Sequence, residues 1–325
     1  MDRTKPTLSV VVISWNQFAH IRRLVTELLD QDYETDRYEI IVVDDGSTDG
    51  TREWLRSVSN ERIRPIFGDR HGGRAASRNR GIKVASGNIV VMIDGDHSVE
   101  RDFLAIHASR HASERCVIVG KSEFEDHPDS RALNHYLNNG GAAKLSLGSR
   151  LPGRYFLTRN CSVPTDLLLE IGLFDERFNV WGGEDLDLGM RLEETATPIY
   201  GETRCLAVHH HLRPLHELLR NLLTYGKECL PLLLARHPRL FYELNLDRTF
   251  SLLNMRSRYS VFYRGAFRLL MYSPVCFVFR FLVVALRRHH LPRIVFDYLH
   301  LRQYTRGYMS YLATAKEKKR SGGTH

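Results

Sequence analysis

Cysteine is scarce in this sequence, and no cysteine pair has the spacing of a metal site. The five cysteines are scattered over 325 residues, at positions 116, 161, 205, 229 and 276. Their odd number and the lack of a CxxC pair argue against a disulfide framework and a zinc site. They fit a reducing compartment.

Long apolar runs are also missing. The opening MDRTKPTLSVVVISW lacks the apolar core of a signal peptide and passes straight into a strand-like run. No uninterrupted apolar run reaches the roughly 20 residues that a membrane-spanning helix needs. With 43% apolar and 26% charged residues, the chain has the composition of a globular protein, and we expect it in the cytoplasm.

Charge is unevenly distributed along the chain. Residues 213–325 hold 20 Lys and Arg against 6 Asp and Glu, a net charge of +14, whereas residues 1–212 hold 26 against 32, a net charge of −6. The basic part favours an anionic surface, and a peripheral location at the inner face of a membrane would suit it. Nucleic acid is not expected as a partner, because no nucleic-acid-binding motif accompanies the charge.

Strand-like and helix-like segments alternate in the first 100 residues. The patterns predict strands at residues 8–14, 38–43, 63–67 and 88–93, and helices at 20–29, 51–58 and 75–85. This order predicts a parallel α/β sheet. Further on we expect a strand at 116–120, a long loop at 121–155, a helix at 166–172, a helix from 183 and a strand at 204–211. Helices are then expected at 215–234, 259–272, 275–288 and 293–313.

Acidic residues follow two of the predicted strands. Asp44 and Asp45 end the second strand, and Asp94-Gly95-Asp96 ends the fourth. Open α/β sheets bind ligands at the carboxyl ends of their strands. Two carboxylates one residue apart can approach one Mg²⁺ or Mn²⁺ ion, which also binds phosphate oxygens. The alternative interpretation is a polar turn, since Asp and Gly are favoured there.

Basic residues lie between the two acidic strand ends. Arg74, Arg78 and Arg80 can bind phosphate through bidentate hydrogen bonds, so a ligand with a diphosphate and a metal would find both partners here. A solvated helix face is the alternative, above all for Arg80. The phosphate-loop pattern GxxxxGK[ST] and the dinucleotide pattern GxGxxG are both absent.

These segments together resemble the family 2 glycosyltransferases, which have the GT-A fold. The matching stretches are SVVVISWN at 9–16, VVDDGSTDGT at 42–51, ASRNRGIKVASG at 76–87, MIDGDH at 92–97 and GLFDERFNVWGGEDLDLGMRL at 172–192. The resemblance implies a Rossmann-like α/β fold, a mostly parallel sheet flanked by helices, with a C-terminal α-helical extension. Residues 1–212 would be the catalytic domain, with a nucleotide-sugar-binding half at 1–100 and an acceptor-side half at 101–212. A basic helical region would follow at 213–325.

The resemblance also implies how the donor and a metal are bound. Family members bind a nucleotide-diphosphate sugar. By position, Asp45 would hydrogen-bond the base with Ser14 and Trp15 close by, and Arg78 would approach the nucleotide or the diphosphate.

A divalent metal, Mn²⁺ or Mg²⁺, is implied at the DGD motif. Asp96 would ligate it, and Asp94, beside Gly95, would contact the ribose or the metal. A late-strand histidine would complete the metal shell, and the chain offers three at 209–211. Strand alternation places His209 and His211 on one face, and we prefer His209.

The WGGED stretch would carry the catalysis in this resemblance. Asp185 would be the general base, because a sugar hydroxyl is a poor nucleophile and must lose its proton as it attacks C1. One base opposite the leaving group gives a single displacement, hence inversion. Glu184 would hold sugar hydroxyls, Trp181 would stack on a sugar ring, and Gly183 would leave room for the sugar. Taken alone, acids in a first helical turn are ordinary, and Trp181 could equally be a core residue.

The acceptor is not defined by the resemblance. We expect a hexosyl- or N-acetylhexosaminyl-type transferase acting on a glycan or glycolipid, such as a cell-envelope polysaccharide or a lipid-linked acceptor. Short apolar helices with arginines, such as residues 275–286 with Arg280, can lie in a membrane interface. They could instead pack on the catalytic domain or on another subunit.

Two rival functions stay open. One is a nucleotidyltransferase, which also uses acids, a metal and arginines but gives the GGED helix no task. The other is a non-catalytic nucleotide-sugar-binding scaffold. The complete set of acids, Asp45, Asp94, Asp96, Glu184 and Asp185, argues against the scaffold.

Overall fold

The structure is a computed structural model that describes residues 5–140, 147–211, 214–253, 260–271 and 273–321. By their contacts, the residues form two compact units. Unit 1 comprises Met1–Glu125, Leu137–Asn179 and Glu184–Leu212. Unit 2 comprises Asp126–Tyr136, Val180–Gly183 and Arg213–His325.

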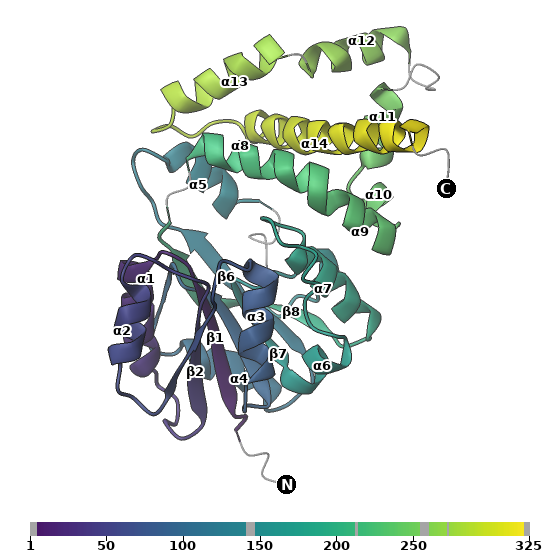
Figure 1. Ribbon diagram of the computed structural model, residues 1–325. Helices are drawn as coiled ribbons and strands as arrows, with labels where there is room; N and C mark the ends of the chain where they lie inside the picture. Colours follow the sequence, from purple (N-terminus) through teal and green to yellow (C-terminus); the bar gives the residue numbers. More distant parts are fainter. Residues whose placement is uncertain (1–4, 141–146, 212–213, 254–259, 272, 322–325) are drawn as a thin grey trace. The chain divides into compact units, whose positions relative to one another are not determined.

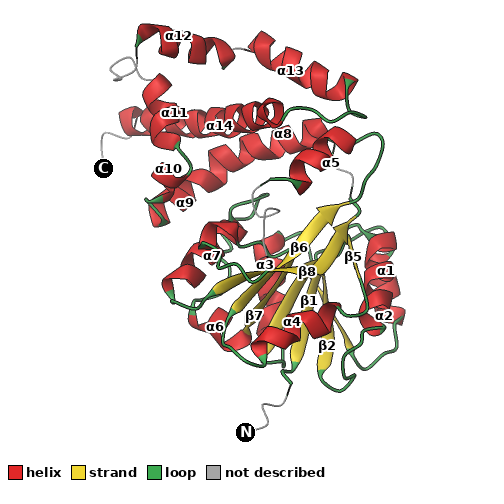
Figure 2. Cartoon of the chain, turned by 180° about the vertical axis from the view of Figure 1, so that it is seen from behind, coloured by secondary structure: helices red, strands yellow, loops and turns green. Residues whose placement is uncertain are grey.

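Unit 1 is built on a mixed sheet, which has eight strands in the described residues, in the order β3-β2-β1-β4-β7-β6-β8-β5 (Figures 1 and 2). The strands are β1 Leu8–Ser14, β2 Tyr38–Asp44, β3 Ile63–Phe67, β4 Ile89–Asp94, β5 His97–Val99, β6 Val117–Phe124, β7 Asn160–Pro164 and β8 Ile199–His209. β1 is parallel to β2 and β4, β2 to β3, and β6 to β8. β7 runs antiparallel to β4 and β6, and β5 antiparallel to β8. The predicted α/β fold with a mostly parallel sheet is confirmed.

Helices cover both faces of this sheet. α1 Phe18–Leu29, α2 Thr51–Ser57 and α4 Phe103–His111 bury side chains against one face. α3 Arg74–Lys83, α6 Thr165–Glu170 and α7 Glu184–Glu194 do so against the other. Alternation along the strands explains the two cores, since Val10 and Val12 of β1 belong to the first core and Val11 to the second.

The strand directions place the carboxyl ends of the parallel strands at one edge of the sheet. The parallel strands end there, at Ser14, Asp44, Asp94, Phe124 and His209. β7 and β5 run the other way and therefore begin at this edge. Their first residues, Asn160 and His97, lie beside Ile93 and His209. The edge thus joins residues that are far apart in the sequence.

The predicted loop at 121–155 is wrong in three places. β6 continues to Phe124, and a helix, α5, spans Arg131–Asn138; a short 3-10 turn follows at Gly153–Tyr155. A register shift between Gly120 and Lys121 lets β6 pair with the second half of β8, a long-range contact that local sequence does not reveal. Residues 141–146 of this segment lie outside the described residues. The last strand also starts earlier than predicted and ends at His209, while β5, α4 and β7 were not predicted.

Unit 2 is helical, which confirms the predicted C-terminal extension. α8 Leu215–Thr224, a π-helical turn Tyr225–Cys229 and α9 Leu230–Arg236 follow one another where one helix was predicted. The later helices are α10 Leu240–Glu243, α11 Leu246–Leu253, α12 Val261–Leu270, α13 Ser273–Ala285 and α14 Arg293–Ser321. A Cβ atom on Gly226 would lie 2.1 Å from the carbonyl oxygen of Tyr304, and one on Gly307 equally close to that of Leu223. α14 therefore crosses the α8 region at close range through glycines.

No helix in the described residues is by itself long and apolar enough to cross a membrane. Val261–Leu270 and Pro274–Ala285 reach the required length and hydropathy only together. A bend of 52° lies between them.

Candidate active site

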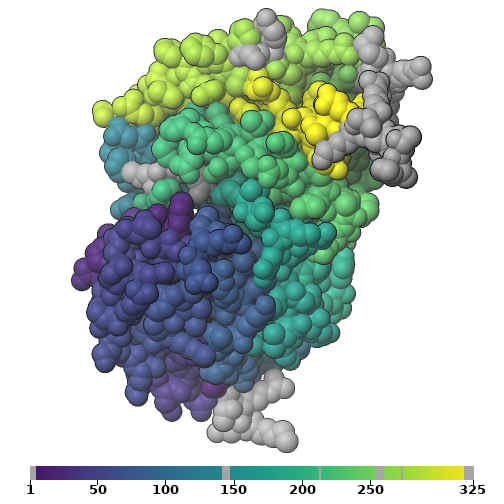
Figure 3. Space-filling view, viewed as in Figure 1, coloured from purple at the N-terminus to yellow at the C-terminus, as the bar shows by residue number. Residues whose placement is uncertain are grey.

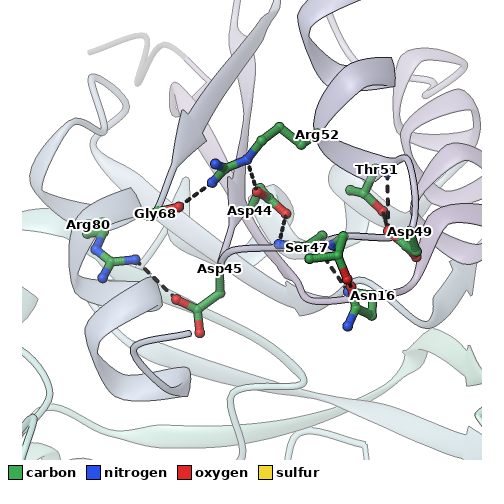
Figure 4. A network of polar contacts seen from close by, with 10 residues as sticks. Asn16, Asp44, Asp45, Ser47, Asp49, Thr51, Arg52, Gly68 and Arg80 are labelled. Carbon is green, nitrogen blue, oxygen red and sulfur yellow. Dashed lines mark hydrogen bonds and ion pairs between the residues drawn. The ribbon is translucent and has the colours of Figure 1, made fainter. Parts of the chain in front are cut away.

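The carboxylate of Asp45, just after β2, is held by the loop before α3. It accepts hydrogen bonds from the amides of Gly72, at 3.0 and 3.1 Å, and of Gly73, at 3.0 Å. Arg80 Nη1 lies 3.1 Å away (Figure 4), and His71 Nδ1 lies 2.8 Å away. Gly73 has a φ of +88°, which side-chain-bearing residues rarely adopt, so this arrangement of amides requires a glycine.

The neighbouring Asp44 is fully buried and organises the loop after β2. It accepts a hydrogen bond from Arg52 Nε at 3.0 Å and from the amide of Ser47 at 3.1 Å. Arg52 also donates to the carbonyl oxygen of Gly68, and Asn16 joins the network through Ser47 (Figure 4). The ends of β1 and β2 are therefore fixed relative to each other.

Ser14 and Trp15 stand at the end of β1 beside Asp45. The carbonyl of Ser14 accepts the amide of Asp45 at 2.9 Å, and its buried hydroxyl has no hydrogen-bond partner in the described part of the chain. Trp15 is 48% exposed and stacks on His71, with 4.3 Å between the ring centroids. An open aromatic face next to a fixed carboxylate can take a flat heterocyclic ring. The structure thus brings together the three residues to which the resemblance assigned the base.

Arg78 on α3 is the centre of a buried cluster. Its Nη2 donates to Asp94 Oδ1 at 2.8 Å and its Nη1 to Glu184 Oε1 at 3.2 Å. Asp185 Oδ1 lies 3.7 Å from the same Nη1. Burial alone would lower the pKa of Arg78, but the carboxylates of Asp94, Asp185 and Glu184 outweigh it and raise the pKa. Arg78 therefore ties the DGD segment to the GGED segment.

Glu184 and Asp185 open α7. Asp185 Oδ1 accepts a hydrogen bond from Thr158 Oγ1 at 2.6 Å, and its side chain is 24% exposed. Glu184 is buried, and its Oε2 has no hydrogen-bond partner among the described residues. Burial raises the pKa of Glu184, and nearby Asp185 adds to this effect despite Arg78. The carboxylate of Asp185 is thus held in place and partly exposed. Glu184 keeps one carboxylate oxygen that can accept a hydrogen bond from a ligand hydroxyl.

The two glycines before these acids have a backbone role. Gly182 and Gly183 have φ values of +92° and +97°, a region that favours glycine. They shape the turn that leads into α7. Trp181 and Gly183 belong to unit 2, so their contacts with a donor sugar stay predictions.

Asp96, His97 and His209 form a group of candidate metal ligands. Their ligand atoms lie within 4.8 Å of one another, and all three residues are buried. His209 Nε2 is 3.4 Å from Asp96 Oδ2. His97 uses both ring nitrogens, with Nδ1 3.1 Å from Asp96 and Nε2 3.2 Å from Ser122 Oγ. The pair of a carboxylate and an imidazole fits Mn²⁺, and His97 is placed to orient Asp96.

The protonation of this pair suits a metal. Burial lowers the pKa of His209 to about 3, so its ring is neutral at physiological pH. Burial alone would raise the pKa of Asp96, but the hydrogen bond from His97 and the proximity of His209 hold it below its usual range. The ring of His210, in contrast, contacts Ser98 at 2.7 Å and Glu125 at 2.9 Å.

Asp94 and Gly95 have different surroundings from Asp96. Asp94 lies outside the group of candidate ligands in the described residues and pairs with Arg78, so its contact with ribose or metal stays a prediction. A Cβ atom on Gly95 would lie 2.8 Å from the carbonyl oxygen of Ile13. Glycine is therefore needed there for the end of β4 to pack against β1.

Four residues at this edge of the sheet were not predicted from the sequence. They are Phe124, Thr158, Arg159 and the metal-side His97. His97 is part of the quoted MIDGDH stretch and could have been found there. Thr158 and Arg159 precede the apolar stretch NCSVP, and they could have been found only by expecting a strand that returns antiparallel to β4.

A sheet with this order and with these two acidic segments at its carboxyl edge defines the GT-A fold class. The solved mannosyltransferase PcManGT from Pyrobaculum calidifontis, in complex with GDP-Man and Mn²⁺, has a similar fold. The TM-score is 0.62 at 18% identity, covering 96% of this chain and 88% of that one.

The sequence comparison identifies the family to which the matched part of the chain belongs. Residues 9–165 match the family Glycosyl transferase family 2, so this stretch is a family 2 glycosyltransferase domain. It is 32% identical over 225 residues to the validoxylamine A glucosyltransferase of Streptomyces hygroscopicus subsp. jinggangensis, over 60% of this chain and 53% of the relative. It is 28% identical over 231 residues to glycosyltransferase AglE of Haloferax volcanii, over 70% and 74%. The chain spans about half the length of the validoxylamine A glucosyltransferases it matches.

Proposed function

We propose that this chain transfers a sugar from a nucleotide-diphosphate donor to an acceptor hydroxyl, with inversion at C1. The supporting observation is the buried cluster in which Arg78 joins Asp94, Glu184 and Asp185, next to Asp96. The similar proteins are glycosyltransferases, and the structural neighbour was solved with GDP-Man and Mn²⁺. These observations favour glycosyl transfer over a nucleotidyltransferase or a scaffold.

The donor base would stack on Trp15 and hydrogen-bond Asp45. A carboxylate offers about four acceptor positions, and two backbone amides, Arg80 and His71 already use those of Asp45. His71 is half exposed, so it is the partner that an entering base can displace most easily. In this proposal residues 1–100 bind the donor and residues 101–212 face the acceptor.

Asp185 would remove the proton from the acceptor hydroxyl. Thr158 and Arg78 both lie against its Oδ1, and its partial exposure leaves the other oxygen open to a substrate. Asp96 and His209 would hold Mn²⁺ or Mg²⁺, which when bound neutralises charge on the leaving diphosphate. Glu184 would accept hydrogen bonds from sugar hydroxyls through its unpartnered oxygen.

The test starts with the donor. Ligands that bind the folded state raise the melting temperature, so UDP-, GDP- and dTDP-sugars are screened with and without Mn²⁺. Transfer or hydrolysis of the stabilising donor is then compared for the wild type and Asp185→Asn. We expect kcat to fall about 10²- to 10⁴-fold with donor affinity retained.

The matched control is Asp166→Asn. Asp166 also lies in the first turn of a helix, α6, but pairs with Arg115. Its replacement should leave kcat unchanged. Full turnover by Asp185→Asn, or release of pyrophosphate instead of a nucleoside diphosphate, would contradict the proposal.

The proposal extends to unit 2, where α12 and α13 would rest on an anionic membrane surface near a lipid-linked acceptor. Their large apolar side chains are exposed; they include Val261, Phe262, Leu269, Phe277, Val278, Phe281 and Val284. In the space-filling view these helices, light green to yellow-green, form part of the visible surface (Figure 3). α13 has 13 residues and spans about 20 Å, less than a hydrocarbon core of about 30 Å. A helix of this kind suits the interface, and the net charge of residues 213–325 suits anionic lipid.

Liposome flotation tests this extension. Wild type should float with phosphatidylglycerol-containing vesicles and not with pure phosphatidylcholine, and Phe277→Glu/Phe281→Glu should stay in solution. Leu169→Glu, at an exposed apolar position of unit 1, is the control that should still float. Equal flotation of all three proteins would refute the assignment. So would a dimer of the wild type that the double variant disperses, because these helices would then meet a second copy.

A further inference from the structure

Positive charge is needed at the carboxyl edge of the sheet if a diphosphate is to bind there. Four carboxylates, those of Asp94, Asp96, Glu184 and Asp185, converge on this edge and would repel it. Arg78 was expected to approach the diphosphate, but in the described residues its hydrogen bonds and ion pairs go to carboxylates of the protein itself, and its side chain is 3% exposed. Another cation is therefore required besides a metal.

Arg159 is placed to supply this charge. Its neighbour Asn160 pairs with Ile93 in the antiparallel β4–β7 ladder, so Arg159 continues opposite Asp94 at the end of β4. Thr158, on its other side, donates to Asp185. The position is thus fixed between the DGD segment and the proposed base.

An aromatic ring holds the guanidinium of Arg159 next to the metal side. Its Cζ lies 5.5 Å from the ring centroid of Phe124, and the ring of His209 lies 4.5 Å from the same phenylalanine. Asn160 anchors the backbone by donating to the carbonyl oxygens of Lys121 and Cys205. The guanidinium of Arg159 therefore lies beside the phenylalanine ring that also contacts His209.

Arg159 has no ion pair in the described part of the chain, unlike Arg78. Its Nε is buried and lacks a hydrogen-bond partner among the described residues. Burial lowers the pKa of Arg159, and the attraction of Asp94, Asp185 and Asp96 only partly opposes this. Arg159 is half-buried, and a guanidinium whose Nε is buried without a bonded anion is costly; such groups are found where a ligand is bound.

We propose that Arg159 hydrogen-bonds the diphosphate of the donor and neutralises it as the nucleoside diphosphate leaves. This inference rests on the proposed function and moves the phosphate-binding role from Arg78, a positioning residue, to Arg159. As the acceptor oxygen forms its bond to C1, the bond from C1 to the phosphate oxygen breaks. The electron pair passes to that oxygen beside Arg159, and the hydroxyl proton passes to Asp185. The fork of a guanidinium matches two phosphate oxygens.

Calorimetry with Mn²⁺ tests this role, using UDP, GDP and dTDP and the three corresponding monophosphates as probes. Arg159→Gln should bind the diphosphate that the wild type prefers about tenfold or more weakly, with the monophosphate little affected. Arg159→Lys should recover part of the affinity. The melting temperature of ligand-free Arg159→Gln should equal or exceed that of the wild type, because the substitution removes an uncompensated buried charge.

Arg56→Gln is the matched control, since Arg56 also lies over a phenylalanine, Phe67 at 5.1 Å, but is exposed. Unchanged diphosphate affinity in Arg159→Gln would overturn the inference, and so would an effect on the acceptor KM alone. Equal loss of mono- and diphosphate binding with a lowered melting temperature would assign Arg159 to the fold and also overturn it. Failure of the wild type to bind any nucleoside diphosphate would instead remove the proposed function itself.

Discussion

The ends of β2 and β4 carry similar acidic turns, yet the structure stabilises them in different ways. At the β2 end, Asp45 is bonded mainly by backbone amides of a glycine loop, with Arg80 and His71 at its margin. At the β4 end, the carboxylates are held by side chains, Arg78 and His97, that come from other elements. Backbone donors are already in place before a ligand arrives, whereas a cluster of charged side chains depends on every member.

The difference indicates two separate tasks. A carboxylate fixed by amides presents a constant hydrogen-bonding edge, which suits recognition of a base. A cluster of opposed charges holds several acids close together against their repulsion, which suits metal binding and catalysis. Substitutions at each end test whether the carboxylates of β2 and β4 are stabilised in different ways.

The largest expected effect is on the free energy of unfolding, and it should differ between the arginines of the two ends. Arg78→Met should lower the free energy of unfolding by about 3–5 kcal/mol, because it leaves buried carboxylates without a partner. Arg80→Met should cost less than about 1 kcal/mol, because Arg80 is partly exposed and Asp45 keeps its amides. Urea unfolding followed by circular dichroism measures both. Similar losses of unfolding free energy in the two variants would show that the carboxylates of the two ends are stabilised in the same way.

The β4 end also shows how far the sequence could predict the site. The DGD motif was predicted from its place after an apolar strand, and the late histidine and the GGED acids from the resemblance to family 2 glycosyltransferases. The sequence could not predict that Arg78 pairs with these acids and does not stand open to a ligand. This pairing depends on the approach of α3 and α7 in space, and the sequence contains no local signal for it.

Metal binding should also depend on the β4 end and not on the β2 end. Mn²⁺ at 100 times its dissociation constant should stabilise the wild type by about 2.7 kcal/mol. Asp96→Asn should abolish this stabilisation, because Asp96 and His209 are the proposed ligand pair. Asp45→Asn should retain it. Thermal unfolding with and without Mn²⁺ provides the measurement, and loss of the Mn²⁺ effect in both variants would contradict the assignment of the metal to β4.

The buried His209 at the β4 end should make the stability of the protein depend on pH below neutrality. His209 has a folded pKa of about 3 against an ordinary 6.5, so the unfolded chain binds its proton first as the pH falls. Its contribution is present above pH 6.5 and is lost between 6.5 and 3, by about 2 kcal/mol at pH 5. In EDTA, His209→Gln should therefore lose less stability than the wild type between pH 7 and pH 5. An identical loss of stability for His209→Gln and the wild type would refute the prediction.

The fold shows a similar limit of sequence reasoning. The strands β1, β2 and β4 were predicted because each contains a continuous apolar run. β7, β5 and the extension of β6 were not, since their pairing partners lie far away in the sequence. The acidic end of β2 was therefore predictable from neighbouring residues, but Arg159, which precedes β7, was not.

The smallest effect is expected from the aromatic ring at the β2 end. Trp15→Ala should weaken nucleotide binding by about 0.5–1.5 kcal/mol, because an exposed stacking surface is removed without disturbing the core. The loss should be equal for mono- and diphosphates, since Trp15 would contact the base and not the phosphates. Titration calorimetry of Trp15→Ala beside Arg159→Gln separates the two ends, because only the arginine variant should discriminate between the two kinds of nucleotide. If Trp15→Ala also discriminates, Trp15 lies near the phosphates, and the base must bind elsewhere than at the β2 end.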